Sequence, residues 1–253
     1  MAVTASIKKG FGVATHSMTI VGLLSLFGFV WSLLNIYYAP KIQAQTQTPD
    51  PKLSILIMIA TVIFILVSIF LQSGTLGYVR DKIKQGNANL SAFMGAGSKY
   101  YIKLFVVGLI IALTAMVFIL VAALAVAFLK KPGFFIAVPV ALAAIYFILL
   151  MFFAPYIVVV NEEKSMAAIK KSIGLVKKNL LGVLGISAIL VAIGFVIGLL
   201  AGVILGLMNV AAPGVVSQVA YAVLSSVLNA FLGVFVTASF MNFYMEISNT
   251  AGA

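Results

Sequence analysis

The sequence predicts an all-α integral membrane protein with six transmembrane helices, and its composition and long apolar runs carry that prediction. Of the 253 residues, 64% are hydrophobic and only 8% are charged, and the mean hydropathy is +1.23. Soluble domains usually carry about a quarter charged residues, so lipid is the expected solvent for most of this chain. Six apolar runs reach the roughly 20 residues that a helix needs to cross a bilayer. Barrel strands would instead alternate apolar and polar residues over about ten positions.

The predicted spans are uninterrupted apolar stretches joined by short connections. The first span follows Lys8 and Lys9, as a secretory signal would, but its roughly 22 apolar residues exceed the 7–15 of a signal core, so we expect it to be retained. The connections at 129–133 and 209–214 allow only tight turns, and 41–52 is a short polar loop, which leaves no room for an external domain. The spans cover residues 18–39, 53–78, 103–129, 133–160, 179–208 and 214–246.

The positive charges predict the orientation of these spans. Of the 16 lysine and arginine residues, four lie on the side of the loop 41–52, and the rest lie on the side that holds both termini. Cytoplasmic loops carry the excess of Lys and Arg, which predicts cytoplasmic N- and C-termini in a multi-pass protein of the inner or plasma membrane. The net charge of +11 is thereby assigned to the membrane surface, and no nucleic acid partner is expected.

A basic, half-apolar segment occurs twice, at residues 5–22 and 162–183, with Ile-Lys-Lys-x-x-Gly in both copies. In the second copy, Met166, Ile169 and Val176 belong to one apolar face, and the lysines lie largely off it. This pattern is typical of an amphipathic helix in the membrane interface. Lysines in such a helix are attracted to anionic lipids of the cytoplasmic leaflet. We therefore expect headgroup contacts from Lys8, Lys9, Lys170, Lys171, Lys177 and Lys178.

A looser third copy lies at residues 89–108, with Phe93, Tyr100 and Tyr101 as its expected interfacial anchors. The three copies predict a repeated unit, in which one interfacial helix precedes a hairpin of two spans. A simpler interpretation is that any lysine-rich inner loop before a span looks amphipathic, because cytoplasmic loops are basic. On the first interpretation, residues 1–253 form a single polytopic membrane domain with pseudo-repeats at 1–78, 79–160 and 161–246.

Three stretches, at residues 74–105, 154–182 and 239–248, resemble a prokaryotic family of six-span membrane proteins. That family also occurs fused to glycerophosphodiester phosphodiesterases. The resemblance implies a membrane fold with a cytoplasmic N-terminus. It does not imply phosphodiesterase activity, because the hydrolase is a separate soluble domain that this chain lacks, and it leaves the function of a stand-alone member unknown.

The sequence holds few groups for catalysis or metal binding. It has no cysteine, and His16 is its only histidine, so neither a metal site nor a nucleophile–base–acid arrangement can be assembled. No acid falls at the middle of a span, where a proton-coupled transporter usually has one. We therefore expect no enzyme activity, no metal and no cofactor. The acidic residues are Asp50, Asp81, Glu246 and the pair Glu162 and Glu163, which we expect in the first turn of the second basic helix, where the dipole favours them.

Two patterns inside the spans bear on function. Glycines recur every fourth residue of the fifth span, and such a ladder lets another helix approach closely; the alternatives are a groove for a lipid chain or substrate, or contact with a second copy. One face of the sixth span is polar, which predicts hydrogen bonds between helices or the lining of a polar cavity. Pro139 and Pro155 should bend the fourth span, but no discontinuous helix flanking a site is expected. The ladder is Gly194, Gly198, Gly202 and Gly206, and the polar face is Gln218, Ser225 and Asn229.

These features favour a non-catalytic membrane protein that organises lipid or a membrane complex. Its expected partners are membrane lipids, with anionic headgroups on the cytoplasmic leaflet, and either other membrane proteins or a second copy of the chain. The alternative is a small transporter or channel for a lipid-like or small neutral substrate, which the glycine ladder and the polar face of the sixth span support.

Overall fold

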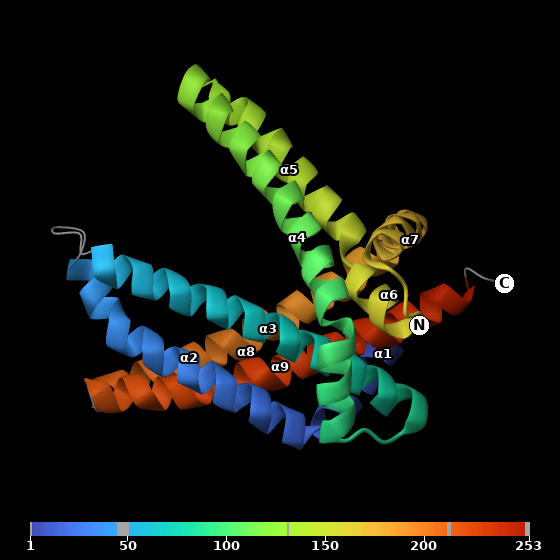
Figure 1. The fold of residues 1–253 in the computed structure, drawn as a ribbon, viewed down its shortest axis with the longest axis horizontal. Coiled ribbons are helices and arrows are strands. Elements are labelled where there is room, and N and C mark those ends of the chain that lie inside the picture. Colours follow the sequence, from blue (N-terminus) through green and yellow to red (C-terminus); the bar gives the residue numbers. More distant parts are fainter. Residues whose placement is uncertain (1, 45–50, 131, 212–213, 251–253) are drawn as a thin grey trace.

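The computed structural model describes residues 2–44, 51–130, 132–211 and 214–250, which form nine α-helices and no strand (Figure 1). Continuous apolar sequence between short polar or proline-containing breaks accounts for this architecture. In lipid, backbone N–H and C=O groups find no water, so each apolar run forms a helix in which they bond to one another. The helices are α1 Ala2–Thr15, α2 Met18–Ala44, α3 Pro51–Gln85, α4 Leu90–Leu129, α5 Gly133–Met151, α6 Ala154–Val160, α7 Ser165–Lys178, α8 Leu180–Ala211 and α9 Val215–Thr250.

Six stretches of the described chain are long and apolar enough to cross a membrane, so the prediction of a six-span, all-helical membrane protein is confirmed. At most 28% of the most apolar window of any stretch is buried, as expected of helices that face lipid. The stretches are Met18–Tyr38, Pro51–Gln85, Leu90–Leu129, Gly133–Val160, Leu180–Met208 and Val215–Asn249.

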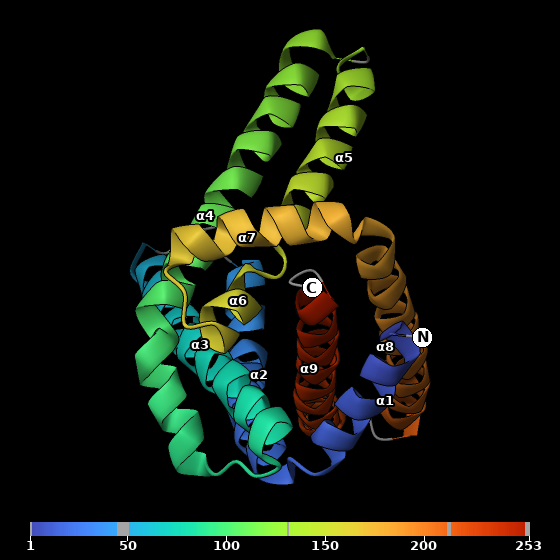
Figure 2. The same ribbon diagram turned by 90° about the vertical axis from the view of Figure 1, so that its right-hand side faces the viewer.

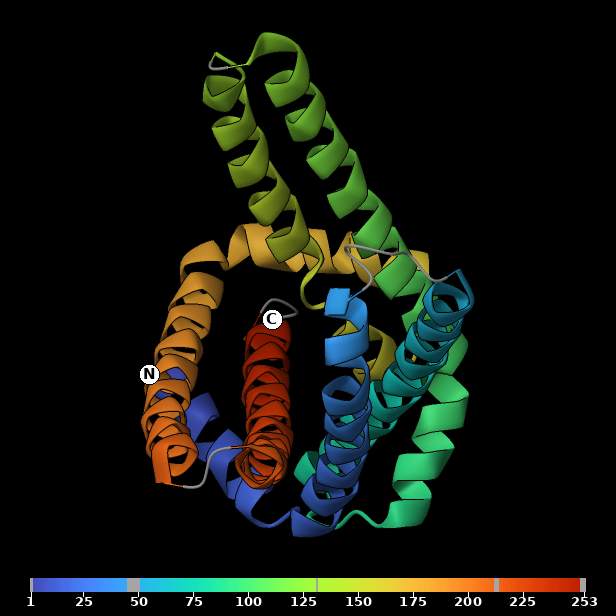
Figure 3. The same cartoon turned by 90° about the vertical axis from the view of Figure 1, so that its left-hand side faces the viewer.

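The spans form two groups. Helices α2, α3, α8 and α9 run together, whereas α4 and α5 leave them at a steep inclination (Figure 1). Seen from the far end of the bundle, α8, α9, α2 and α3 follow one another in that order (Figure 3). The main packing partner of α2 is α9, and α3 packs mainly along α4.

The core lies at one end of the bundle, where the termini of several spans meet three short helices. The largest fully buried side chains include Tyr100, Phe93, Phe153 and Phe243. In this core Phe153, the residue immediately before α6, packs against Tyr244 in the C-terminal half of α9, with 5.9 Å between the two ring centroids. Helices α1 and α7 lie at the same end, where α7 runs crosswise past one side of the C-terminal part of α9 (Figure 2). We call this region the packed end.

Helices α1 and α7 have the same length, 14 residues, and each is separated from the following span by a short break. The break after α1 is at His16 and Ser17, and the break after α7 is at Asn179. Asn179 caps α7 by donating from Nδ2 to the carbonyl of Leu175 at 3.1 Å. His16, expected in an interfacial helix, therefore lies at the corner between α1 and α2.

The third basic copy does not form a helix of its own. Residues 90–129 are one continuous helix, α4, whose first turn is capped by Asn89, the side chain of which accepts from the N–H of Ala92 at 2.9 Å. No break separates an interfacial segment from a span in this stretch. Phe93 and Tyr100, expected as interfacial anchors, are instead fully buried.

The fourth span is discontinuous, contrary to expectation. Helix α5 ends at Met151 and α6 begins at Ala154, because Pro155 has no N–H to continue the helix. Ser172 of α7 satisfies the groups freed by the break: its Oγ donates to the carbonyl of Leu150 at 2.8 Å and accepts from the N–H of Phe153 at 3.1 Å. The break is therefore held by α7.

Candidate functional site

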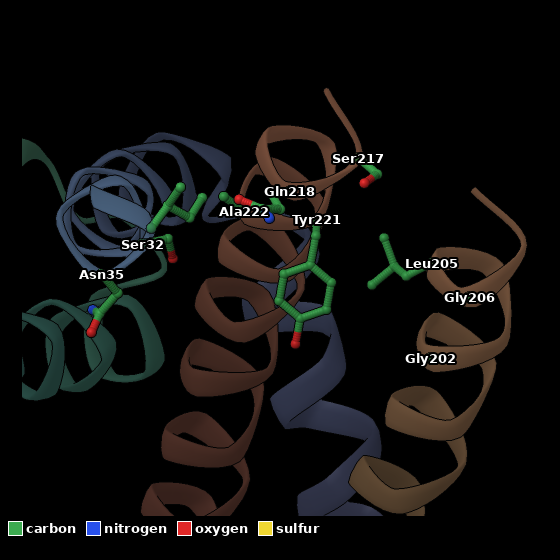
Figure 4. A pocket seen from close by; sticks show the side chains of 10 residues that line it. Ser32, Asn35, Gly202, Leu205, Gly206, Ser217, Gln218, Tyr221 and Ala222 are labelled. Carbon is green, nitrogen blue, oxygen red and sulfur yellow. The ribbon is translucent and has the colours of Figure 1, made fainter. Parts of the chain in front are cut away.

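A cavity of about 620 Å³ opens between α2, α8 and α9 at the end of the bundle away from the core (Figure 4). The ring of Tyr221 on α9 extends toward α8, and Leu205 of α8 faces it across the gap (Figure 4). Polar groups surround the mouth, and glycines form the α8 wall. The lining residues are Ser32, Asn35 and Ile36 of α2, Gly202, Leu205 and Gly206 of α8, and Ser217, Gln218, Tyr221 and Ala222 of α9.

Two further cavities continue this opening along the same pair of helices. A cavity of about 170 Å³ shares Gly202, Leu205 and Tyr221 with the first. A third, of about 290 Å³, shares Ile197 and Leu232 with the second and ends at Ile7, Lys8 and Phe11 of α1. Together the three cavities form a single line from the mouth to α1, which we call the α8–α9 groove.

Three glycines of the ladder, Gly198, Gly202 and Gly206, line this groove. A Cβ atom placed at any of Gly194, Gly198, Gly202 or Gly206 would meet no heavy atom within 4 Å in the described chain. The expected close packing against a neighbouring span is therefore not present within this chain. At the base of the groove, Phe11 of α1 packs edge-on against Phe231 of α9 at 6.0 Å and lines the cavity there.

The polar face of α9 lies on the opposite wall of the groove. Gln218 lines the mouth, and Ser225 and Asn229 line the cavity below it. The Ser225 hydroxyl donates to the carbonyl of Ala222 at 3.3 Å, within its own helix. No hydrogen bond from these three side chains to α8 is present in the described residues. The groove is thus polar at its mouth and mainly apolar at its base.

The lysines assigned to headgroup contact lie on the surface of the packed end. Lys8 lines the base of the groove, and Lys171 and Lys178 line a separate pocket beside α9. The face that α7 turns to the protein consists of Ala168, Ile169, Ser172 and Val176, and Met166, expected on that face, is 59% exposed. All six lysines are exposed: Lys8, Lys9, Lys170, Lys171, Lys177 and Lys178.

A polar cluster joins α3, α4 and the loop before α7, and the sequence analysis did not predict it. Arg80 donates from Nη1 to the hydroxyl of Tyr100 at 2.6 Å and to the carbonyl of Val159 at 3.0 Å. The Tyr100 hydroxyl donates in turn to Oε1 of Glu162 at 2.9 Å, and Lys99 forms an ion pair with the same oxygen at 2.6 Å. One feature of the sequence could have pointed to this cluster: Arg80 is its only arginine.

The sequence predicted that Glu162 lies in the first turn of α7, but Glu162 precedes that helix. Its φ of 57° is in the left-handed region, which a non-glycine residue adopts at a cost of order 1–3 kcal/mol. Contacts with α4 hold it there, including the bond from Lys103 Nζ to its carbonyl at 3.1 Å. Hydrogen bonds from Lys99 and then from Tyr100 lower the pKa of the Glu162 carboxyl. Glu163 likewise precedes α7 and forms an ion pair with Lys171.

Within the described residues, no group of three or more His, Cys, Asp or Glu side chains is placed to hold a metal ion. Neither the curated proteins nor the solved structures provide a match to this chain. A family model described as a domain of unknown function, DUF7847, matches residues 1–247. Because that match covers nearly the whole sequence, this chain with six candidate spans belongs to the DUF7847 family.

Proposed function

We propose that this protein is a non-catalytic membrane protein that binds and organises lipid, holding one hydrocarbon chain in the α8–α9 groove. The observation that carries the proposal is the groove itself. It is open along two apolar spans, its α8 wall is bare because of the glycines, and no helix of the described chain occupies it.

The surroundings and size of the groove favour a hydrocarbon chain as its occupant. The groove lies between helices that face lipid, so lipid is the molecule available to fill it. From Ile193 at its base to Gly206 at its mouth it follows α8 for roughly 20 Å, at 1.5 Å per residue. The hydrocarbon core of a bilayer is roughly 30 Å thick, so the groove is long enough to cross one leaflet and part of the other. Polar side chains at the mouth, such as Gln218 and Tyr221, would meet the glycerol or ester region.

Helices α1 and α7 complete the proposal. Both helices have their lysines on the exposed side. Helix α1 precedes the spans α2 and α3, and α7 precedes the spans α8 and α9. We propose that both lie in the cytoplasmic interface as the start of a pseudo-repeat, so that the packed end faces the cytoplasm. The middle unit keeps its hairpin, α4 and α5, without a separate interfacial helix.

The test of lipid binding compares two glycine variants of α8 by native mass spectrometry of gently extracted protein. Gly202→Leu places a side chain in the groove, and we expect it to abolish most of the retained lipid. Gly185→Leu adds the same side chain to the same helix where a Cβ also meets nothing, but outside the groove, and we expect it to retain lipid like the unmodified protein. Equal lipid retention by all three proteins would exclude the groove as the binding site.

Orientation is tested separately, on a chain that has no natural cysteine. A cysteine in place of Thr46, which lies outside the described residues, should react with an impermeant thiol reagent added to intact cells. A cysteine in place of Asn87, in the exposed loop between α3 and α4, should react only after the cells are opened. The reverse pattern would invert the proposed topology.

A transporter or channel is the second candidate function, and one observation favours it. Ser225 and Asn229 line the groove midway between its mouth and its base, where a purely hydrocarbon site needs no polar group. If water enters to that depth, the groove is a path for a polar or amphipathic substrate rather than a seat for a lipid chain.

A further inference from the structure

We propose that a second pocket, separate from the α8–α9 groove, binds a phosphate-bearing anion. This pocket has a volume of about 420 Å³ and lies at the packed end, between α6, α7 and the C-terminal part of α9. We call it the α7–α9 pocket. The residues that would recognise the anion are Lys171, Lys178, Asn161, Tyr244 and Ser248.

The two lysines of the pocket are on one side of α7, seven residues apart. That separation is two helical turns, or about 10 Å along the axis. Gly174, between them, also lines the pocket, and a Cβ placed there would meet nothing within 4 Å. The helix surface between the two ammonium groups is therefore bare. An anion can lie against it and reach both lysines.

The opposite wall supplies hydrogen-bonding groups. The Tyr244 hydroxyl donates to Oδ1 of Asn161 at 3.0 Å, which fixes the direction of that amide. The amide nitrogen of Asn161 has no acceptor among the described residues. Ser248 adds a hydroxyl, which in the structure donates to the carbonyl of Met245 at 3.1 Å and is free to rotate toward a better acceptor.

Of the two lysines that line the pocket, one has a carboxylate partner. Glu163 pairs with Lys171 from outside the lining, and no acidic residue lines the pocket itself. Lys178 has no carboxylate partner among the described residues. Ammonium groups bind phosphate oxygens as point charges, and neutral N–H and O–H donors complete the shell. Two lysines two turns apart and a cavity of 420 Å³ suit a phosphate with its substituent better than a single carboxylate.

The phosphate has two possible sources, a lipid headgroup at the membrane surface or a soluble phosphate compound. One experiment distinguishes them. In the lipid arm, protein in mixed micelles with phosphatidic acid and phosphatidylcholine is analysed by native mass spectrometry, and phosphatidic acid retained in excess of phosphatidylcholine is measured. In the soluble arm, broadening of the phosphorus resonance of inorganic phosphate or pyrophosphate is followed as protein is added.

The helix offers a matched control for charge. Lys171→Ala with Lys178→Ala should lower binding about tenfold or more, as expected when charge-assisted hydrogen bonds are lost. Lys170→Ala with Lys177→Ala removes the same net charge from the same helix, outside the pocket, and should change binding less than about twofold, the effect of an exposed charge. Gly174→Leu fills the pocket without changing charge and should also abolish binding. Gly202→Leu, in the α8–α9 groove, should leave it intact, so the two proposals can fail independently.

Binding in either arm that follows this pattern supports the proposal and identifies the source of the phosphate. Equal losses in the two double-lysine variants would mean that the lysines act as a diffuse surface charge, which overturns it. Absence of binding in both arms, or full binding by Gly174→Leu, would overturn it as well.

Discussion

The two halves of α9 have similar hydrophobic character but different neighbours. From Ala230 to Ile247 the helix is largely buried among α1, α2, α3 and α6, whereas from Val215 to Asn229 most of its side chains are exposed or line the groove. The buried half contains the aromatic residues Phe235, Phe240 and Phe243. Hydrophobicity alone therefore does not decide which part of a helix packs against protein; in α9 the phenylalanines lie in the packed half.

Glycines sharpen the comparison between the packed end and the groove. At Gly10 of α1, an added Cβ would lie 2.7 Å from the backbone nitrogen of Ser239, because α1 crosses α9 there at close range. At Gly198 of α8, an added Cβ meets nothing. The same residue type therefore permits a helix crossing in one region and leaves open space in the other.

The largest expected effect is that of Gly10→Leu. Overpacking of a close crossing typically costs about 1–3 kcal/mol, and the clash with backbone places this variant at the upper end. Gly198→Leu should leave the stability of the chain unchanged, because the added side chain enters the groove. Thermal unfolding in detergent measures both. Similar stabilities of the two variants would remove the distinction between the regions.

A smaller effect is expected from Ser172→Ala at the packed end. The Ser172 hydroxyl is buried and bridges the two helices of the fourth span, so its removal leaves backbone groups at Leu150 and Phe153 without their partner. The cost is about 1–3 kcal/mol. Ser98→Ala is the control, because that exposed hydroxyl bonds only within its own helix. Unfolding temperatures that fall equally in the two variants would contradict a specific role for Ser172.

The smallest effect is a dependence on pH through Glu162. The pKa of this carboxyl is lower in the folded protein, because Lys99 and Tyr100 donate hydrogen bonds to its charged form. Its stabilising contribution is therefore fully present above the unfolded-state value of about 4.3 and is lost as the pH falls through the lowered, folded-state value. Glu162→Gln should be less stable than the unmodified protein at neutral pH, and unfolding scans should show the difference closing in acid. A constant difference at all pH values would contradict this linkage.

The sequence was sufficient for the number of spans, because continuous apolar runs leave no other structure in lipid, but the second and third spans belong to longer helices than predicted, Pro51–Gln85 and Leu90–Leu129. The two basic segments at 5–22 and 162–183 do contain separate short helices, α1 and α7, which end at Thr15 and Lys178. The sequence did not predict that Ser172 forms hydrogen bonds across the break before Pro155, because Ser172 and the break lie far apart in the sequence. The partners of Glu162 were missed for the same reason, and the sequence could not decide between close packing and an open groove at the glycine ladder: each depends on which helices become neighbours.

The most direct test of the account is whether water or hydrocarbon fills the α8–α9 groove. Because the chain has no cysteine, single cysteines in place of Ser225 or Asn229 report on that space without background. In lipid nanodiscs, neither should react with a charged, water-soluble thiol reagent, whereas a cysteine in place of Asn87 should react fully. Rapid labelling at 225 and 229 would show a water-filled path, contradict the lipid-binding account and favour transport.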